Sequence, residues 1–376
     1  MQKYGKGAAF TLLKTLFTLL KTRLTLLITG PKIFVNLPSS KEIDITSTKF
    51  LTFFRFSTEN IHFYQFDDST NFFNNPLSKS QKTCYNDSGR DGEENMKTEQ
   101  KAPAKINLTL DIASVLPDGY HSIFTVMQTV DLCDTVTVET ADGGVTLTCT
   151  EGAIPCDERN TAYKAAALFR KAANITEGVQ VHIEKRIPSQ AGLAGGSADA
   201  AAVLRALDEL FPERLTEKQL YEIAFSIGAD VPFCLAGGAR LCLNKGEIMA
   251  RLPSLDAWVV LVKPEENVST GEAYARFDSA QELFHPDNDR FLFHAAKGEY
   301  KKALAYAANT FEDLCDLPCG AGIKSALYAG GAYYAAMSGS GSAFFGLFDD
   351  EARAAQTAKA LRRTYERTWL CRTVTK

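Results

Sequence analysis

The sequence predicts a mixed α/β protein of the α+β type with two domains. Strand-like alternation of apolar and polar residues interleaves with helix-like three-to-four spacing through the first half of the globular part. The strand patterns lie at 103–114, 123–130, 135–139 and 178–186, and the helix patterns at 160–174 and 216–227. A second series of strand and helix patterns begins at residues 252–258. A chain of 376 residues is long enough for about two domains.

Composition excludes several classes of protein. Hydrophobic residues make up 45% and charged residues 23% of the chain, as in ordinary globular proteins. The net charge of −4 argues against a general polyanion-binding surface. Nine cysteines are scattered, and the one close pair, Cys315 and Cys319, has no histidine at zinc-ligand spacing. They are expected to be free thiols in a reducing compartment.

The first 95 residues differ sharply from the rest. They hold two alanines but 11 of the 24 phenylalanines, and their net charge is +3 against −7 for the remainder. Residues 8–29 are apolar, but Lys14, Lys21 and Arg23 interrupt them, which argues against a membrane span or a secretory signal. A transit peptide fits better, because residues 1–41 contain seven basic residues and no acidic one.

The preferred interpretation of residues 1–95 is translated upstream sequence. Their Phe, Asn, Lys, Ile and Tyr content is typical of AT-rich codons, and Met96 is the first methionine after Met1. Residues 92–95 fit a purine-rich stretch before a start codon. We therefore expect a non-globular extension, disordered or loosely helical, and a functional protein that starts at Met96. An intact mass that includes residues 1–95 would contradict this. A cytoplasmic bacterial location follows, or a plastid one if the segment is a transit peptide.

The first predicted strand, 103–114, has two distinct faces. Ile106, Leu108 and its other alternating apolar residues face inward, while Lys105 and Asn107 lie on the opposite face. A lysine there is usually solvated. A turn at 117–119 follows, and His121 at its exit is by default a surface or hydrogen-bonding residue.

A glycine loop follows the strand pattern at 178–186. Gly192, Gly195 and Gly196 precede a helix pattern for which Ser197 is the expected N-cap, with Asp199 in the first turn. Such a loop presents free backbone N–H groups to an anion, so it is a candidate phosphate site. It has neither the Walker sequence nor the dinucleotide fingerprint.

A carboxylate stands at a second predicted helix start. Asp230 lies between Gly228 and Pro232, and on local grounds it is a capping residue. The second unit then continues with one strand, a helix that begins at Thr270, two more helices, a glycine turn followed by a strand, and a closing helix. These elements are expected at 257–262, 270 onward, 289–297, 299–314, 337–348 and 350–364.

Five segments in fixed order resemble a known family. They are PAKINL at 103–108, DGYHS at 118–122, PSQAGLAGGSADAA at 188–201, GADVPF at 228–233 and SGSGSAFF at 338–345. Together they resemble the GHMP kinase superfamily, which includes galactokinase, homoserine kinase and mevalonate kinase. Within it, the first, second and fourth segments are similar to the 4-diphosphocytidyl-2-C-methyl-D-erythritol kinases. The resemblance covers about residues 97–376.

This resemblance implies a fold and a reaction. Residues 96–252 would form an ATP-binding domain with a ribosomal-protein-like βαβ unit, and residues 253–376 a ferredoxin-like domain. Family members use ATP and Mg²⁺ to phosphorylate the 2-hydroxyl of 4-(cytidine 5′-diphospho)-2-C-methyl-D-erythritol, in the methylerythritol phosphate route to isoprenoid precursors.

The resemblance also implies roles for residues. Lys105 and Asp230 match the catalytic pair, and Ser197 lies near magnesium. The phosphate loop is Pro188, Ser189, Gln190, Ala191, Gly192, Leu193, Ala194, Gly195, Gly196, Ser197 and Ala198. The substrate residues are Asn107, Tyr120, His121, Thr270, Tyr274, Gly339, Ser340 and Gly341. Tyr120 and Tyr274 would stack on the cytosine, and His121 would read its edge. Ser189 and Gln190 depart mildly from the family pattern.

Two other functions are considered. A sister kinase for homoserine or mevalonate would lack the DGYH turn, and a non-catalytic ligand sensor would lose the base or the glycine loop. We expect a small-molecule substrate and a monomer or weak homodimer. No nucleic-acid or membrane partner is expected, because the globular part is net negative without a basic run.

Overall fold

The computed structural model describes residues 95–116, 118–280 and 283–375, together with the backbone of four short strands nearer the N-terminus. These are β1 (Leu27–Thr29), β2 (Lys32–Phe34), β3 (Phe50–Phe56) and β4 (Ile61–Asp67), in two antiparallel pairs. They belong to a different compact unit from residues 95–375. These pieces are strands where disorder or a loose helix was expected. The remainder of residues 1–94 and Pro117 lie outside the described residues, so the non-globular extension stays a prediction.

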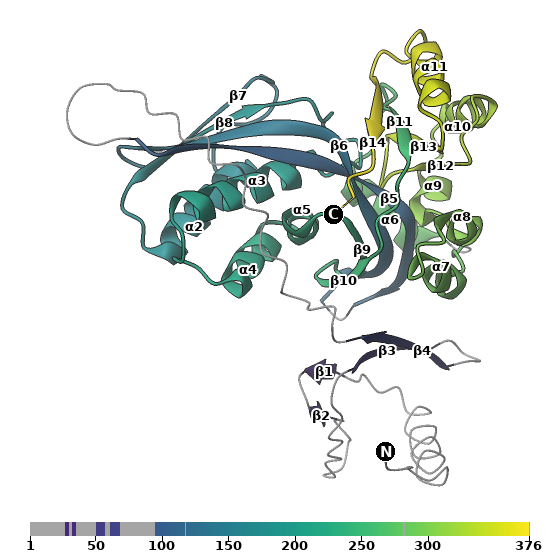
Figure 1. The fold of residues 1–376 in the computed structure, drawn as a ribbon, viewed down its shortest axis with the longest axis horizontal. Coiled ribbons are helices and arrows are strands. Elements are labelled where there is room, and N and C mark those ends of the chain that lie inside the picture. The colour runs from purple at the N-terminus through teal and green to yellow at the C-terminus, as the bar shows by residue number, and fades with distance from the viewer. Residues whose placement is uncertain are drawn as a thin grey trace. The chain divides into compact units, whose positions relative to one another are not determined.

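A large sheet is built on two long strands, β5 (Lys97–Val115) and β6 (His121–Ala141), which pair antiparallel (Figure 1). The other edge of β6 pairs with β9 (Ala239–Asn244) along its first half and β8 (Gly178–Glu184) along its second. The outer strands are β10 (Ile248–Leu252), antiparallel to β9, and β7 (Val145–Cys149), parallel to β8.

One prediction about this sheet is wrong. The segments 123–130 and 135–139 are one continuous strand, β6, rather than two. Asp134 lies between the two predicted segments. Asp134 is fully buried, where the ammonium of Lys185 and two backbone N–H groups satisfy its carboxylate. A buried charge is tolerated inside a strand when it is paired in this way.

Helices α2 (Thr161–Ala173), α3 (Gly195–Leu210) and α4 (Glu217–Ile227) lie along one face of the large sheet (Figure 1). The predictions at 160–174 and 216–227 are confirmed. The Asn160 side chain caps α2, and Thr216 with Gln219 forms a capping box at α4. α3 packs against β5 and β6, so the segment that carries the glycine loop rests on the centre of the sheet.

The second sheet contains four antiparallel strands in the order β12-β13-β11-β14. They are β11 (Trp258–Val262), β12 (Tyr334–Met337), β13 (Phe344–Phe348) and β14 (Thr368–Arg372). Helices α10 (Gly320–Ala329) and α11 (Glu351–Leu361) pack against them. The chain order, strand, helices, two strands, helix and strand, is that of a ferredoxin-like unit. Helix α11 is not the closing element, because β14 follows it.

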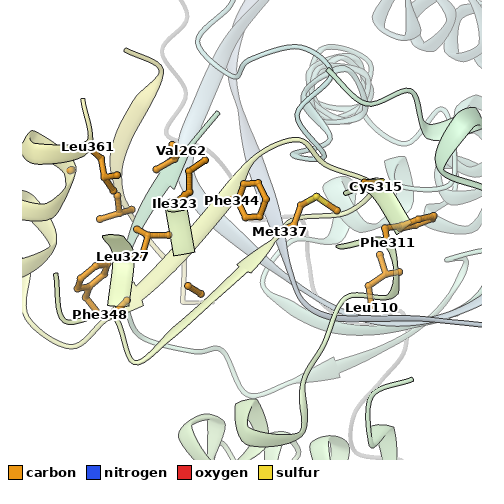
Figure 2. Packing of buried hydrophobic residues seen from close by; sticks show 14 of the residues in the cluster. Leu110, Val262, Phe311, Cys315, Ile323, Leu327, Met337, Phe344, Phe348 and Leu361 are labelled. Carbon is orange, nitrogen blue, oxygen red and sulfur yellow. The ribbon is translucent and has the colours of Figure 1, made fainter. Parts of the chain in front are cut away.

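One apolar core lies under the second sheet and extends to the first. Figure 2 shows Val262, Phe344 and Phe348 of the strands packed with Leu327 of α10. Leu110 of β5 belongs to the same cluster, so the two sheets share buried apolar surface. The predicted domain boundary at 252/253 falls in the connection from β10 to β11 and stays a prediction.

The remaining helices are α6 (Thr270–Ser279), α7 (Asn288–Ala295), α8 (Tyr300–Ala303), the 3₁₀ turn η1 (Leu304–Tyr306) and α9 (Thr310–Cys315). The single helix predicted at 299–314 is therefore divided into three pieces. Asn309 accounts for the break before α9, because it is extended and uses its side chain to cap α9 and to bind two distant carbonyls. Within the described part of the chain, no helix is both long and apolar enough to cross a bilayer.

Candidate active site

The glycine loop joins β8 to α3, as predicted, but the helix begins three residues earlier than expected. Its first residue is Gly195, and the N-cap is Ala194 in a left-handed conformation without a side-chain cap. The prediction that Ser197 is the N-cap is wrong, because Ser197 lies inside the first turn. The first-turn N–H groups therefore lack a side-chain acceptor, which leaves them available to an anion.

The loop is in close contact with the turn at 338–341. Gly192 has a φ of 71°, and a Cβ on it would lie 2.0 Å from the carbonyl oxygen of Ser338. The Ser338 hydroxyl donates to the Gly192 carbonyl at 3.0 Å, and Ala343 N donates to Ala191 O at 3.1 Å. Only glycine fits at position 192. The structure thus brings together two glycine segments that lie far apart in the sequence.

Lys105 and Asp230 meet beside these two segments. The Lys105 ammonium lies 3.8 Å from the Asp230 carboxylate, although the residues are far apart in sequence. A Cβ on Gly339 would lie 3.2 Å from Lys105 Nζ, and the Lys105 backbone N donates to Leu193 O at 3.2 Å. Lys105 therefore contacts the loop at 188–194 through its backbone, while its ammonium lies beside the turn at 338–341.

Lys105 is not solvated, contrary to the usual behaviour of a lysine on a strand. Its side chain is 5% exposed and donates to Asn107 Oδ1 at 2.6 Å. Asn107 in turn donates to Thr125 Oγ1 at 2.8 Å. This chain of hydrogen bonds fixes the ammonium, and β-bulges on either side of Lys105 and Asn107 interrupt the regular register of β5.

Asp230 does not act as a capping residue. It occupies the N-cap position of α5 (Val231–Ala236), but its backbone is helical and its side chain makes no capping hydrogen bond. The side chain is 38% exposed. An accessible carboxylate next to a buried ammonium is suited to accept a proton from a bound hydroxyl.

Helix α6 forms a third side of the site, beside the loop at 188–194 and the turn at 338–341. Thr270 Oγ1 lies 3.0 Å from Ser340 Oγ, which links the helix start to the turn at 338–341. Tyr274 is packed edge-on against Phe311. Burial, with a smaller contribution from the charge of Asp230, raises the pKa of Tyr274 to about 12. Tyr274 therefore keeps its proton and lies within the electrostatic reach of the carboxylate.

Of the two residues predicted to bind cytosine from the turn after β5, one packs against helix α6 and the other faces Lys245. His121 stacks on Tyr274 with ring centroids 4.5 Å apart, and its Nε2 lies 2.8 Å from Asp278 Oδ1. Tyr120 is 62% exposed and faces Lys245, whose ammonium lies 4.0 Å from the ring centroid. The predicted sandwich of Tyr120 and Tyr274 around a pyrimidine is therefore not formed here and stays a prediction.

Sequence reasoning missed three groups at this site. Asn309 Nδ2 donates to Met337 O and Gly339 O, both at 2.8 Å, and so fixes the backbone on both sides of Ser338. Ser338 and Thr125 complete the hydrogen bonds described above. No local pattern marks Asn309 or Thr125, because each acts on a partner distant in sequence, whereas Ser338 lies in the SGSGSAFF segment without having been assigned a role. Among the described residues, no group of three His, Cys, Asp or Glu side chains forms a metal cluster.

Comparison with known proteins places the chain in a family. Residues 160–238 match the family model described as the GHMP kinases N terminal domain, and residues 321–367 the GHMP kinases C terminal model. A 4-diphosphocytidyl-2-C-methyl-D-erythritol kinase from Clostridium botulinum is 39% identical over 281 residues, covering 73% of this chain and 99% of that protein. One from Brevibacillus brevis is 43% identical over 271 residues, covering 71% of this chain and 93% of that protein.

The chain belongs to the 4-diphosphocytidyl-2-C-methyl-D-erythritol kinase family. A crystal structure of a 4-(cytidine 5′-diphospho)-2C-methyl-D-erythritol kinase aligns with a TM-score of 0.65 at 34% identity, covering 74% of this chain and all of that one. A homoserine kinase from Cytophaga hutchinsonii aligns at 0.59 and 19% identity, covering 77% of this chain and 98% of that one. The second likeness is one of fold alone.

Family membership and geometry agree on a small-molecule kinase that uses ATP. Phosphoryl transfer requires positioning and charge neutralisation more than covalent participation by the protein. The loop and the first turn of α3 offer backbone N–H groups, Lys105 offers a hydrogen-bonded cation, and Asp230 offers an accessible carboxylate. All three lie around the backbone contact between Gly192 and the turn at 338–341.

Proposed function

We propose that this chain transfers the γ-phosphoryl group of ATP to the 2-hydroxyl of 4-(cytidine 5′-diphospho)-2-C-methyl-D-erythritol. The observation that carries the proposal is the 3.8 Å approach of Lys105 and Asp230 beside the two glycine segments. The reaction would serve the methylerythritol phosphate route to isoprenoid precursors.

Asp230 acts as the general base. As the substrate hydroxyl attacks the γ-phosphorus, its proton passes to the Asp230 carboxylate, and the bond from the γ-phosphorus to the bridging oxygen of ADP breaks. General-base assistance of this kind contributes roughly 10²–10⁴ in rate. Lys105 keeps Asp230 ionised and offsets the negative charge of the transferred group.

Pro188 to Ala198 bind the nucleotide phosphates, mainly through backbone N–H groups. Ser197, in the first turn of α3, is the residue that would ligate Mg²⁺. When bound, Mg²⁺ neutralises phosphate charge. An uncapped helix start and a serine hydroxyl fit that arrangement. Gly339 and Gly341 allow the backbone of the turn to approach the phosphates, and Ser340 with Thr270 lies beside the acceptor.

The cytosine is assigned to Tyr120, His121 and Tyr274. Stacking on an aromatic ring is worth roughly 1–3 kcal/mol per base. Since His121 occupies a face of Tyr274 in this structure, binding of the base between Tyr120 and Tyr274 requires the His121 ring to move. Asn107, through its contact with Lys105, borders the acceptor.

The proposal extends to the cellular location, the oligomeric state and the partners of the protein. We assign the protein to the bacterial cytoplasm, as a monomer or weak homodimer. Neither nucleic acid nor membrane is proposed as a partner, because residues 96–376 are net negative without a basic run.

The direct test is ADP formation by the full chain with ATP and one acceptor at a time. We expect turnover with the cytidylated substrate and little with 2-C-methyl-D-erythritol 4-phosphate, homoserine or mevalonate. Phosphorus NMR of the product locates the new ester on the 2-hydroxyl. Preferred turnover of homoserine or mevalonate would identify a sister kinase. Binding of ATP without turnover of any acceptor would identify a ligand sensor.

Variants test the catalytic pair. Asp230→Asn and Lys105→Met should each lower kcat by roughly 10²–10⁴. Asp350→Asn is a matched control, because Asp350 also occupies an N-cap and caps α11 through Arg353 N at 2.8 Å, and asparagine caps equally well. Near-native kcat in both catalytic variants would refute the assignment.

A further inference from the structure

A buried ion cluster lies at the junction of β8 and α3, and the mechanism above does not use it. Lys185 directly follows β8, and its Nζ lies 2.5 Å from Asp134 Oδ2 and 2.8 Å from Asp199 Oδ2. The side chains of these three residues are at most 5% exposed. They come from β6, from the end of β8 and from α3, so the cluster joins three separate segments.

Asp134 also holds the entry to the glycine loop. Its second oxygen, Oδ1, accepts hydrogen bonds from the backbone N–H groups of Arg186 at 2.5 Å and Ile187 at 2.8 Å. The next residue, Pro188, has no N–H. One carboxylate therefore fixes both the Lys185 ammonium and the last two backbone donors before the phosphate loop.

The ammonium lies directly under the exit of the same loop. A Cβ on Gly195, the first residue of α3, would lie 3.4 Å from Lys185 Nζ and 3.1 Å from Ile187 Cγ2. Asp199 lies one turn further along α3 and binds the same ammonium. Both ends of the loop thus depend on one cation and its two carboxylates.

Removal of that cation would leave two buried carboxylates facing one another. The buried carboxylate of Asp199 is only partly satisfied even with Lys185 present, because its Oδ1 has no hydrogen-bond partner. Like charges in a buried site must separate or take up a proton. Separation would move α3 away from the strand that leads into the loop.

We propose that Lys185, held between Asp134 and Asp199, is the positioning residue of the phosphate loop and sets the affinity for ATP without contacting the acceptor. Its action is indirect, through the backbone of residues 186–195. The inference rests on the assignment of this loop to ATP. It extends that assignment to three residues that touch neither substrate.

The test compares binding and kinetics of full-chain variants. Titration calorimetry with a non-hydrolysable ATP analogue and Mg²⁺ should show a Kd at least about tenfold higher for Lys185→Met. The KM for the acceptor should stay within about twofold. Lys185→Arg keeps the cation and should recover most of the affinity. Lys301→Met is the matched control, since Lys301 and its partner Asp349 are both more than 60% exposed, and it should bind the analogue as the natural chain does.

A second variant covers the case in which Lys185→Met does not fold. Asp134→Asn retains the shape of the side chain, but an amide offers one acceptor oxygen to the three donors that Asp134 holds. It should also raise the Kd for the analogue severalfold, with thermal unfolding used to confirm the folded state. Folded variants that bind the analogue like the natural chain would overturn the inference and leave the cluster a purely stabilising role. If the natural chain itself bound no ATP, the proposed function would fail first.

Discussion

Substitution of Gly192 by alanine tests the idea that two glycine segments form one cradle. A methyl group there meets the Ser338 carbonyl oxygen at 2.0 Å, well inside van der Waals contact. Either the loop or the turn at 338–341 must move by about 1 Å to relieve this clash. Displacement of a catalytic group by that distance can lower the rate by roughly 10²-fold. We therefore expect kcat/KM for ATP to fall by about two orders of magnitude in Gly192→Ala.

The same substitution also carries a backbone cost that must be separated from the clash. Gly192 has a φ of 71°, and an L-residue in that region is strained by about 1–2 kcal/mol. Gly143 has a φ of 88° with no atom within 4 Å of a built Cβ, so Gly143→Ala carries the strain without the clash. Steady-state kinetics and urea unfolding should show a similar stability loss from strain in both variants, with a further loss and the kinetic defect only in Gly192→Ala. Equal kcat/KM in the two variants would refute the reasoning.

Three further predictions follow from contacts in the structure. Asn309→Ala removes two hydrogen bonds, to Met337 O and Gly339 O, that help to hold the turn at 338–341, so it should lower the free energy of unfolding by about 2–4 kcal/mol and lower kcat; an unchanged kcat would contradict this role. Because the folded-state pKa of Asp199 is raised from 3.8 to about 7, the folded chain holds a proton there that the unfolded chain has lost. Its contribution to stability is therefore present below about pH 4 and decreases by a few kcal/mol as pH rises to about 7. Urea unfolding across pH 5–8 should show the natural chain losing stability relative to Asp199→Asn, and parallel curves would exclude this. Thr216→Ala removes the cap of α4 and should cost about 1 kcal/mol with kinetics unchanged, as thermal unfolding and an activity assay would report.

Local patterns were sufficient for elements whose signals lie within a few residues. The helices α2 and α4 begin within one residue of the predicted patterns at 160–174 and 216–227, and Asn160 and Thr216 cap them by bonding to the backbone two or three residues away. The errors occur where a distant partner changes the local preference. Asp134 continues a strand because Lys185 neutralises it. Asn309 is extended and caps the start of α9 instead of continuing a helix, and its amide donates to carbonyls nearly thirty residues away.

By itself, the sequence determined the two-part α+β organisation, the strand–loop–helix unit with its glycines, and the family that the five segments resemble. Only the tertiary structure decided that Lys105 is buried rather than solvated, that Asp230 faces it instead of capping its own helix, and that Lys185 joins two carboxylates under the loop. The physical reason is the distance along the chain over which each kind of interaction acts. Periodicity and capping act between near neighbours in the chain, whereas burial and ion pairing depend on segments that only the folded sheets bring into contact.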